Sequence, residues 1–175
     1  FILAIFFIFF LNNEAYVSSN SFYECDEKTF SSSQLYNKSI NGILHIDVED
    51  GNEGKIGSGF IVGYQGDTTL IITNSHVIVG SKRVEVRLPN DKKYLATVVF
   101  DGGGESDKND LAILKVLGKI GKVLTLKESQ PVQGEDVLAI GSNFGFSFSS
   151  TKGIVSKIWE KEGLIQTDTS INGGN

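Results

Sequence analysis

The stretch Leu70-Ile71-Ile72-Thr73-Asn74-Ser75-His76-Val77-Ile78 decides how the chain can fold. Its apolar beginning predicts a strand, which ends abruptly at polar residues and a histidine. A second apolar segment, residues 57–63, precedes it, and the turn residues 64–67 lie between the two, so the pair predicts two joined strands. His76 then lies at a strand end on a rigid support. Histidine titrates near neutral pH, which suits a general base.

The composition favours a β-rich chain of ordinary domain size. The chain has 175 residues, of which 40% are hydrophobic, with 20 glycines and only 2 prolines. Together with many β-branched residues, this favours tight hairpins over long helices. The net charge of -5 and the lack of a basic block argue against nucleic acid as a partner. A single cysteine excludes an internal disulfide.

Composition shifts along the chain predict four parts. Residues 1–11 are uninterruptedly apolar, which is typical of a signal peptide or of the end of a membrane anchor. Both alternatives predict an exported domain. The protein would contact a membrane only through this segment, and only if the segment is not cleaved. Residues 12–39 are polar and read as a linker or mobile arm. Residues 40–117 contain about six predicted short strands, as in a small β-barrel, and residues 118–175 contain a shorter, unfinished second series.

The individual strands are predicted from alternation and apolar runs. In residues 44–49 the pattern places His45 on the polar, solvent-facing side of a half-buried strand. Residues 141–145 read as a turn-rich loop, and residues 101–107 as a solvated one. The other predicted strands are residues 56–63, 70–73, 84–88, 94–100, 110–116, 123–126, 136–140, 146–156 and 163–167.

His76 and Asp110 form the most informative pair. A histidine that acts as general base needs its second ring nitrogen held by an acceptor, usually a carboxylate. Each residue borders an apolar strand of the same predicted barrel, so the two side chains can meet in space. The alternative is an acid that caps a loop and a surface histidine that follows a strand.

Six motifs in the same order resemble the trypsin-like serine proteases of the HtrA/Deg group. The resemblance runs from about residue 40 to residue 175. The motifs are Gly57-Ser58-Gly59-Phe60, Thr73-Asn74-Ser75-His76-Val77, Asn109-Asp110-Leu111-Ala112-Ile113-Leu114, Ala139-Ile140-Gly141-Ser142, Gly153-Ile154-Val155-Ser156, and Gln166-Thr167-Asp168 through Asn172.

The resemblance implies an all-β, chymotrypsin-like double barrel, with the second barrel incomplete in this chain. It implies that His76 is the general base and Asp110 its orienting acid. The family nucleophile lies in Gly-Asn-Ser-Gly-Gly, of which Gly174-Asn175 matches the first two residues, so the serine is expected immediately after Asn175. Gly174 would then supply an oxyanion-hole N–H. Gly173 stands where the family usually has proline, which puts only local stiffness in doubt.

The same resemblance predicts the substrates and partners. Ser170 would lie at the base of the primary substrate pocket, so we expect no strong preference for Arg or Lys, although the nearby Asp168 threatens this prediction. The substrates would be unfolded polypeptides, no metal or organic cofactor is needed, and a homotrimer is usual in the family. A non-catalytic homologue that binds peptides in the old cleft is the alternative. The 175-residue chain itself, without a nucleophile, is expected to be inactive and poorly folded in its C-terminal third.

Overall fold

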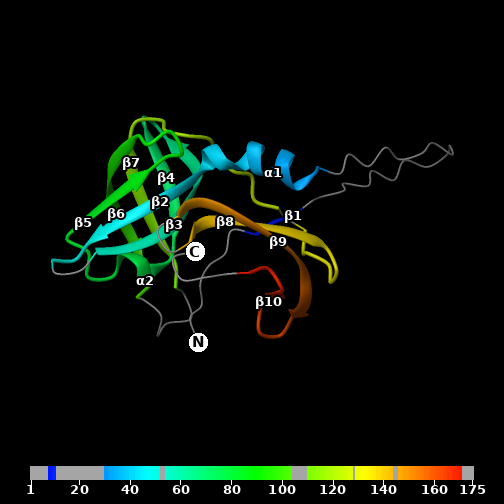
Figure 1. The fold of residues 1–175 in the computed structure, drawn as a ribbon. Helices are drawn as coiled ribbons and strands as arrows, with labels where there is room; N and C mark the ends of the chain where they lie inside the picture. The colour runs from blue at the N-terminus through cyan, green and yellow to red at the C-terminus, as the bar shows by residue number, and fades with distance from the viewer. Residues whose placement is uncertain are drawn as a thin grey trace.

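The computed structural model describes residues 8–10, 30–51, 54–103, 110–127, 129–143 and 146–170. Two β-structures lie next to each other, a closed barrel and an open sheet, as Figure 1 shows. This all-β architecture confirms the predicted chymotrypsin-like fold class, with a complete first barrel and a partial second one. Among the described residues, no helix has both the length and the apolar character needed to cross a membrane.

The closed barrel contains six strands in the order β2-β3-β4-β7-β6-β5, all paired antiparallel. Alternating apolar side chains on each strand fill its interior, because successive residues of a strand point to opposite faces. The strands are β2 (Ile43–Glu49), β3 (Gly54–Gln65), β4 (Thr68–Thr73), β5 (Arg83–Arg87), β6 (Lys93–Asp101) and β7 (Ala112–Leu117).

Three strand ends meet at one end of this barrel. β7 lies between β4 and β6, and Ala112 at its beginning is opposite Thr73 on one side and Asp101 on the other. Because the pairing is antiparallel, β4 and β6 end where β7 begins. Residues that follow β4, follow β6 or precede β7 are therefore brought together here.

The second sheet has the order β1-β8-β9-β10. It contains β1 (Ile8–Phe10), β8 (Asp136–Asn143), β9 (Phe146–Trp159) and β10 (Leu164–Thr167). A second apolar cluster joins it to the barrel, with Ile43 and Phe60 from the barrel and Leu138 and Ile140 from β8. Leu124 completes this contact, so the sheet is held against the outer side of β2 and β3.

A helix forms at the end of the predicted linker. Helix α1 (Ser32–Ser39) is followed by the 3₁₀ turn η1 (Ile40–Gly42). Ser31 accepts a hydrogen bond from the Gln34 N–H, and the Gln34 side chain accepts one from the Ser31 N–H, which satisfies two free donors at the helix start. Leu35 anchors the helix in the second apolar cluster. The prediction of a linker or mobile arm is therefore wrong for residues 32–39, and residues 12–29 lie outside the described part.

Two predictions in the second strand series also need correction. Residues 123–126 form no strand; the Leu124 N–H donates one hydrogen bond to Ile61 O, and the buried Leu124 side chain docks the segment. Isolated bonds of this kind do not make a ladder. The predicted loop 141–145 is strand as far as Asn143, because β8 keeps pairing with β9 across an irregularity in register.

The N-terminal apolar segment is described only at Ile8–Phe10. These residues pair antiparallel with Val137–Ala139 of β8. The pairing does not test whether residues 1–11 serve as a signal peptide or an anchor, which stays a prediction.

Candidate active site

His76 lies at the barrel end where the three strand ends meet. It belongs to α2 (Ser75–Ile78), a single helical turn directly after β4. Val77 and Ile78 are buried in the barrel core and anchor this turn. The His76 side chain is 24% exposed, so the ring is supported on one side and open on the other.

Asp110 binds His76 at two points. One carboxylate oxygen, Oδ2, lies 2.6 Å from ring Nδ1, and the other, Oδ1, accepts the backbone N–H of His76 at 2.8 Å. Asp110 is only 3% exposed. The geometry brings together the two residues that the sequence singled out.

Asn74 is a third partner, which the sequence analysis did not identify. Its side-chain amide donates to the backbone carbonyl of Asp110 at 3.1 Å and to Oδ2 at 3.0 Å. Asn74 is buried. The signal in the sequence was a polar residue two positions before the histidine, after the short apolar run of residues 70–72. Its partner could be found only in the folded chain.

The electrostatics keep Asp110 ionised. Burial acts to raise the pKa of the Asp110 carboxyl, but hydrogen bonds from the ring and backbone of His76 and from Asn74 outweigh it and hold the pKa below its ordinary value. An ionised carboxylate can only accept, so Nδ1 of His76 donates in their contact. The neutral ring then presents Nε2 as a proton acceptor, and no hydrogen bond joins Nε2 to another described residue. A general base needs this arrangement, with one ring nitrogen held by a carboxylate and the other open to accept a proton.

Ser75, between Asn74 and His76, binds a different acid. Its hydroxyl makes a hydrogen bond to Oδ1 of Asp101, the last residue of β6. The same oxygen accepts the N–H of Gly103 at 3.1 Å. The pattern of residues 101–107 predicts a solvated loop, whereas Asp101 ends β6 and is exposed there.

Ser170, the predicted pocket residue, and the nearby Asp168 both follow β10, the last described strand. Ser170 is exposed, and its carbonyl accepts a hydrogen bond from the Thr151 hydroxyl. Asp168 Oδ1 accepts the Ile154 N–H at 2.7 Å. A Cβ on Gly153 would lie 2.4 Å from that oxygen, so the glycine makes room for the carboxylate. Gly174 and the expected nucleophile position lie outside the described residues.

His45 is not on a solvent-facing side, so this prediction is wrong. It is only 3% exposed, because the second sheet covers the outer face of β2 at this position. Its Nδ1 lies 2.7 Å from the Ser142 hydroxyl on β8, and its Nε2 lies 2.9 Å from Asp47 Oδ1. The Ser142 N–H donates to the Ser58 hydroxyl at 2.9 Å. These contacts bind the barrel to the sheet and leave Ser58 and Ser142 buried.

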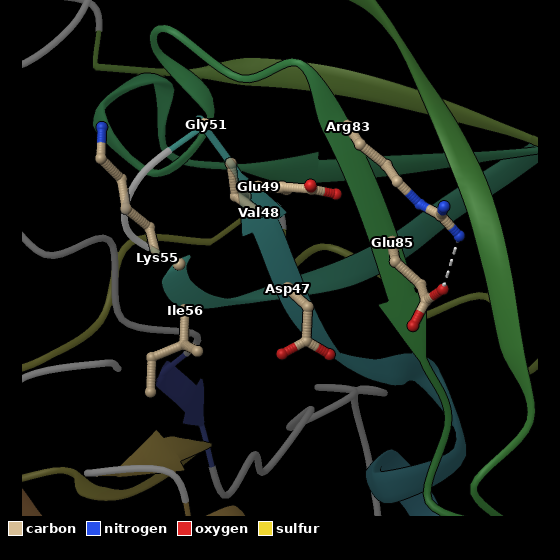
Figure 2. Close-up of a pocket in the computed structure, with 9 residues that line it drawn as sticks. Asp47, Val48, Glu49, Gly51, Lys55, Ile56, Arg83 and Glu85 are labelled. Carbon is tan, nitrogen blue, oxygen red and sulfur yellow. Dashed lines mark hydrogen bonds and ion pairs between the residues drawn. The ribbon is translucent and has the colours of Figure 1, made fainter.

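A separate pocket of about 530 Å³ opens on the outer face of β2, β3 and β5. Figure 2 shows its charged lining, with Lys55 on one side, Arg83 and Glu85 on the other, and Asp47 between them. Neither His76 nor Asp110 lines it. Within the described ranges, no group of three or more His, Cys, Asp or Glu side chains is arranged to hold a metal ion.

Comparison with known proteins shows which family this chain resembles in sequence and in fold. The model of the trypsin-like peptidase domain matches residues 57–175. A probable periplasmic serine endoprotease DegP-like from Marinomonas sp. is 37% identical over 134 residues, which is 73% of this chain and 27% of that protein. The corresponding protein from Hahella chejuensis is 42% identical over 126 residues, 68% of this chain and 25% of its own length. The chain thus spans about a quarter of the curated relatives it matches.

Two solved structures share the fold. The serine endoprotease from Yersinia pestis superimposes with a TM-score of 0.73 and 28% identity, over 85% of this chain and 52% of that one. The HtrA-type protease AlgW, solved with a tripeptide, gives a TM-score of 0.70 and 30% identity, over 83% of this chain and 48% of its own.

Proposed function

The chain belongs to the trypsin-like peptidase domain family of the HtrA/DegP type, and from this premise we propose that it is the protease domain of a serine endopeptidase. The observation that carries the proposal is the contact between Asp110 and both the ring and the backbone of His76. In the proposed mechanism, this contact holds His76 in the tautomer that carries the proton on Nδ1 and orients the ring. Nε2 can then accept a proton from the nucleophile.

In the proposed reaction, a serine immediately after Asn175 attacks the carbonyl carbon of a peptide bond. His76 Nε2 takes the hydroxyl proton, and Asp110 stabilises the imidazolium that forms without being protonated itself. The backbone N–H groups of Gly174 and of the serine hold the oxyanion. His76 then gives the proton to the leaving amine, and the acyl-enzyme is hydrolysed by a water that His76 deprotonates.

The specificity proposed for this domain excludes a strong preference for Arg or Lys. Ser170 carries no charge, and the one acid close to it in the sequence, Asp168, is bonded through Oδ1 to the Ile154 N–H. The hydrogen bond directs one oxygen of the exposed Asp168 toward β9, so the proposal rests mainly on the absence of charge at Ser170. We therefore expect cleavage after small or medium apolar residues, and a peptide-library digest that gave mostly cuts after Arg or Lys would refute this.

The cellular location, the substrates and the oligomeric state of this domain are proposed from its relatives. Their names place them in the periplasm, and we propose that this domain is likewise exported and acts on unfolded polypeptides. A homotrimer is part of the same proposal. Size-exclusion chromatography with light scattering on the protein purified from its source tests the trimer independently of activity.

The deciding experiment begins with the codons that follow Asn175. If they read Ser-Gly-Gly, the complete protein should react with a fluorophosphonate probe at that serine and hydrolyse an unfolded protein. His76→Ala should remove both activities. Asp136→Ala, which breaks only the surface ion pair with Lys152, should retain them. A residue other than serine at this position would contradict the proposal and favour the non-catalytic, peptide-binding alternative.

A further inference from the structure

The three residues at the start of α2 are each bound to an acid. Asn74 and His76 bind Asp110, which precedes β7, whereas Ser75 binds Asp101, which ends β6. The two acids approach the same short helical turn from neighbouring strands, because Asp101 and the start of β7 are paired in the barrel. The role of Asp110 follows from the proposed reaction, whereas the role of Asp101 does not.

The contact between Ser75 and Asp101 joins a buried hydroxyl to the carboxylate of an exposed residue. Ser75 is completely buried, and its hydroxyl binds a carboxylate oxygen that also accepts the Gly103 N–H. A hydrogen bond to an ionised acceptor is about twice as strong as one between neutral groups. Asp101 thereby joins the beginning of α2 to the chain that leaves β6.

The helix itself cannot set its own orientation. α2 has four residues, and such a short helix is not stable by itself, because the cost of nucleation exceeds what so few bonds return. The Asn74 side chain makes no capping bond within the helix. The direction of the His76 backbone therefore depends on tertiary contacts. Val77 and Ile78 hold the end of the turn in the core and Asp110 holds the His76 N–H, whereas the contact of Ser75 with Asp101 holds the beginning of the turn.

We propose that Asp101 is a positioning residue for His76, which it orients through the hydroxyl of Ser75; this role in catalysis rests on the proposed function. With Ser75 tied to Asp101, the first turn of α2 cannot rotate, and the ring of His76 stays in line with Asp110 Oδ2. A misplacement of about 1 Å can lower the rate of an enzyme by on the order of a hundredfold, so a fixed position of the His76 ring favours catalysis.

The test follows the Nδ1 proton of His76 by NMR in the ¹⁵N-labelled chain. A short bond to a carboxylate shifts this proton to low field, and its loss in His76→Gln assigns it. We expect Ser75→Ala and Asp101→Ala each to speed its exchange with water about tenfold, as expected for loss of a hydrogen bond to a charged group. Asp101→Asn keeps an acceptor oxygen and should fall between Asp101→Ala and the parent chain.

A double variant shows whether Asp101 acts through Ser75. The combination of Ser75→Ala with Asp101→Ala should exchange no faster than either single variant, because both remove the same link. Asp136→Ala, at the beginning of β8, removes an equal charge away from α2 and should leave the proton unchanged. If Asp101→Ala does not fold, as judged by circular dichroism, Ser75→Ala still decides, since it removes a single oxygen atom.

An unchanged His76 proton in Ser75→Ala would overturn the proposal, and so would additive effects in the double variant. In the complete protein, Ser75→Ala should lower kcat about tenfold with KM unchanged. The NMR result does not depend on a nucleophile. A complete protein that lacks protease activity but shows the exchange effect would contradict the proposed function, and the link from Asp101 to His76 would still hold.

Discussion

Asp110 holds His76 by two different groups, the ring Nδ1–H at one carboxylate oxygen and the backbone N–H at the other. A contact to the ring alone would leave the histidine free to swing with its backbone. The second contact holds the backbone N–H as well, so the ring and the start of the turn are both joined to Asp110. This buried pair is the feature on which the predicted effects on rate and on pH dependence depend.

Asp110→Asn should lower kcat of the complete protein by about 10⁴-fold, with a small change in KM. An amide can donate to Nδ1 and so stabilise the wrong tautomer of His76, in which Nε2 carries the proton and cannot act as a base. Steady-state kinetics on a peptide substrate measure the loss. Asp136→Asn is the matched control, and a loss of less than tenfold in Asp110→Asn would contradict the assigned role.

Asp110 should also make stability depend on pH. Its pKa is lower in the folded chain than the ordinary aspartate value of about 3.9. The contribution to the free energy of unfolding is therefore fully present above that value and is lost as pH falls through the folded pKa. Urea unfolding of the parent chain and Asp110→Asn should show a difference at pH 7 that narrows below about pH 4. A difference that widens there would contradict the direction of the shift.

Ser142→Ala should destabilise the junction between barrel and sheet. The Ser142 hydroxyl contacts the buried His45 ring, and a buried polar group that loses a partner costs about 1–3 kcal/mol. Urea unfolding measures the change. Ser150→Ala, an exposed serine on the neighbouring strand β9, should change the free energy of unfolding by less than about 0.5 kcal/mol. Equal effects of the two substitutions would show that the His45 contact contributes nothing.

Gly153→Ala should destabilise the segment that follows β10. The added Cβ would lie 2.4 Å from Asp168 Oδ1 and 2.6 Å from Thr169 Oγ1, so either β9 or the segment after β10 must shift. Overpacking of this kind costs about 1–3 kcal/mol. Exchange of the Ile154 amide, which donates to Asp168, should accelerate.

The control for this substitution is Gly63→Ala on β3. Its added Cβ meets no atom within 4 Å, and its stability should stay close to that of the parent chain. If Gly153→Ala were as stable as Gly63→Ala, with the Ile154 amide unchanged, the close packing of Asp168 against β9 would be refuted.

The sequence by itself determined the β class, most strand positions and the pair His76 and Asp110, because alternation and motifs are properties of neighbouring residues. It misplaced His45, which alternation assigned to solvent, since the pattern of one strand cannot show that another sheet covers its polar side. It also gave no partner for Asn74 or Ser75. Only the closed barrel determines the partners of Asn74 and Ser75, because its strand register brings the ends of β4 and β6 to the start of β7. Contacts between residues distant in the chain are fixed by which strands pair, and that is a property of the tertiary structure.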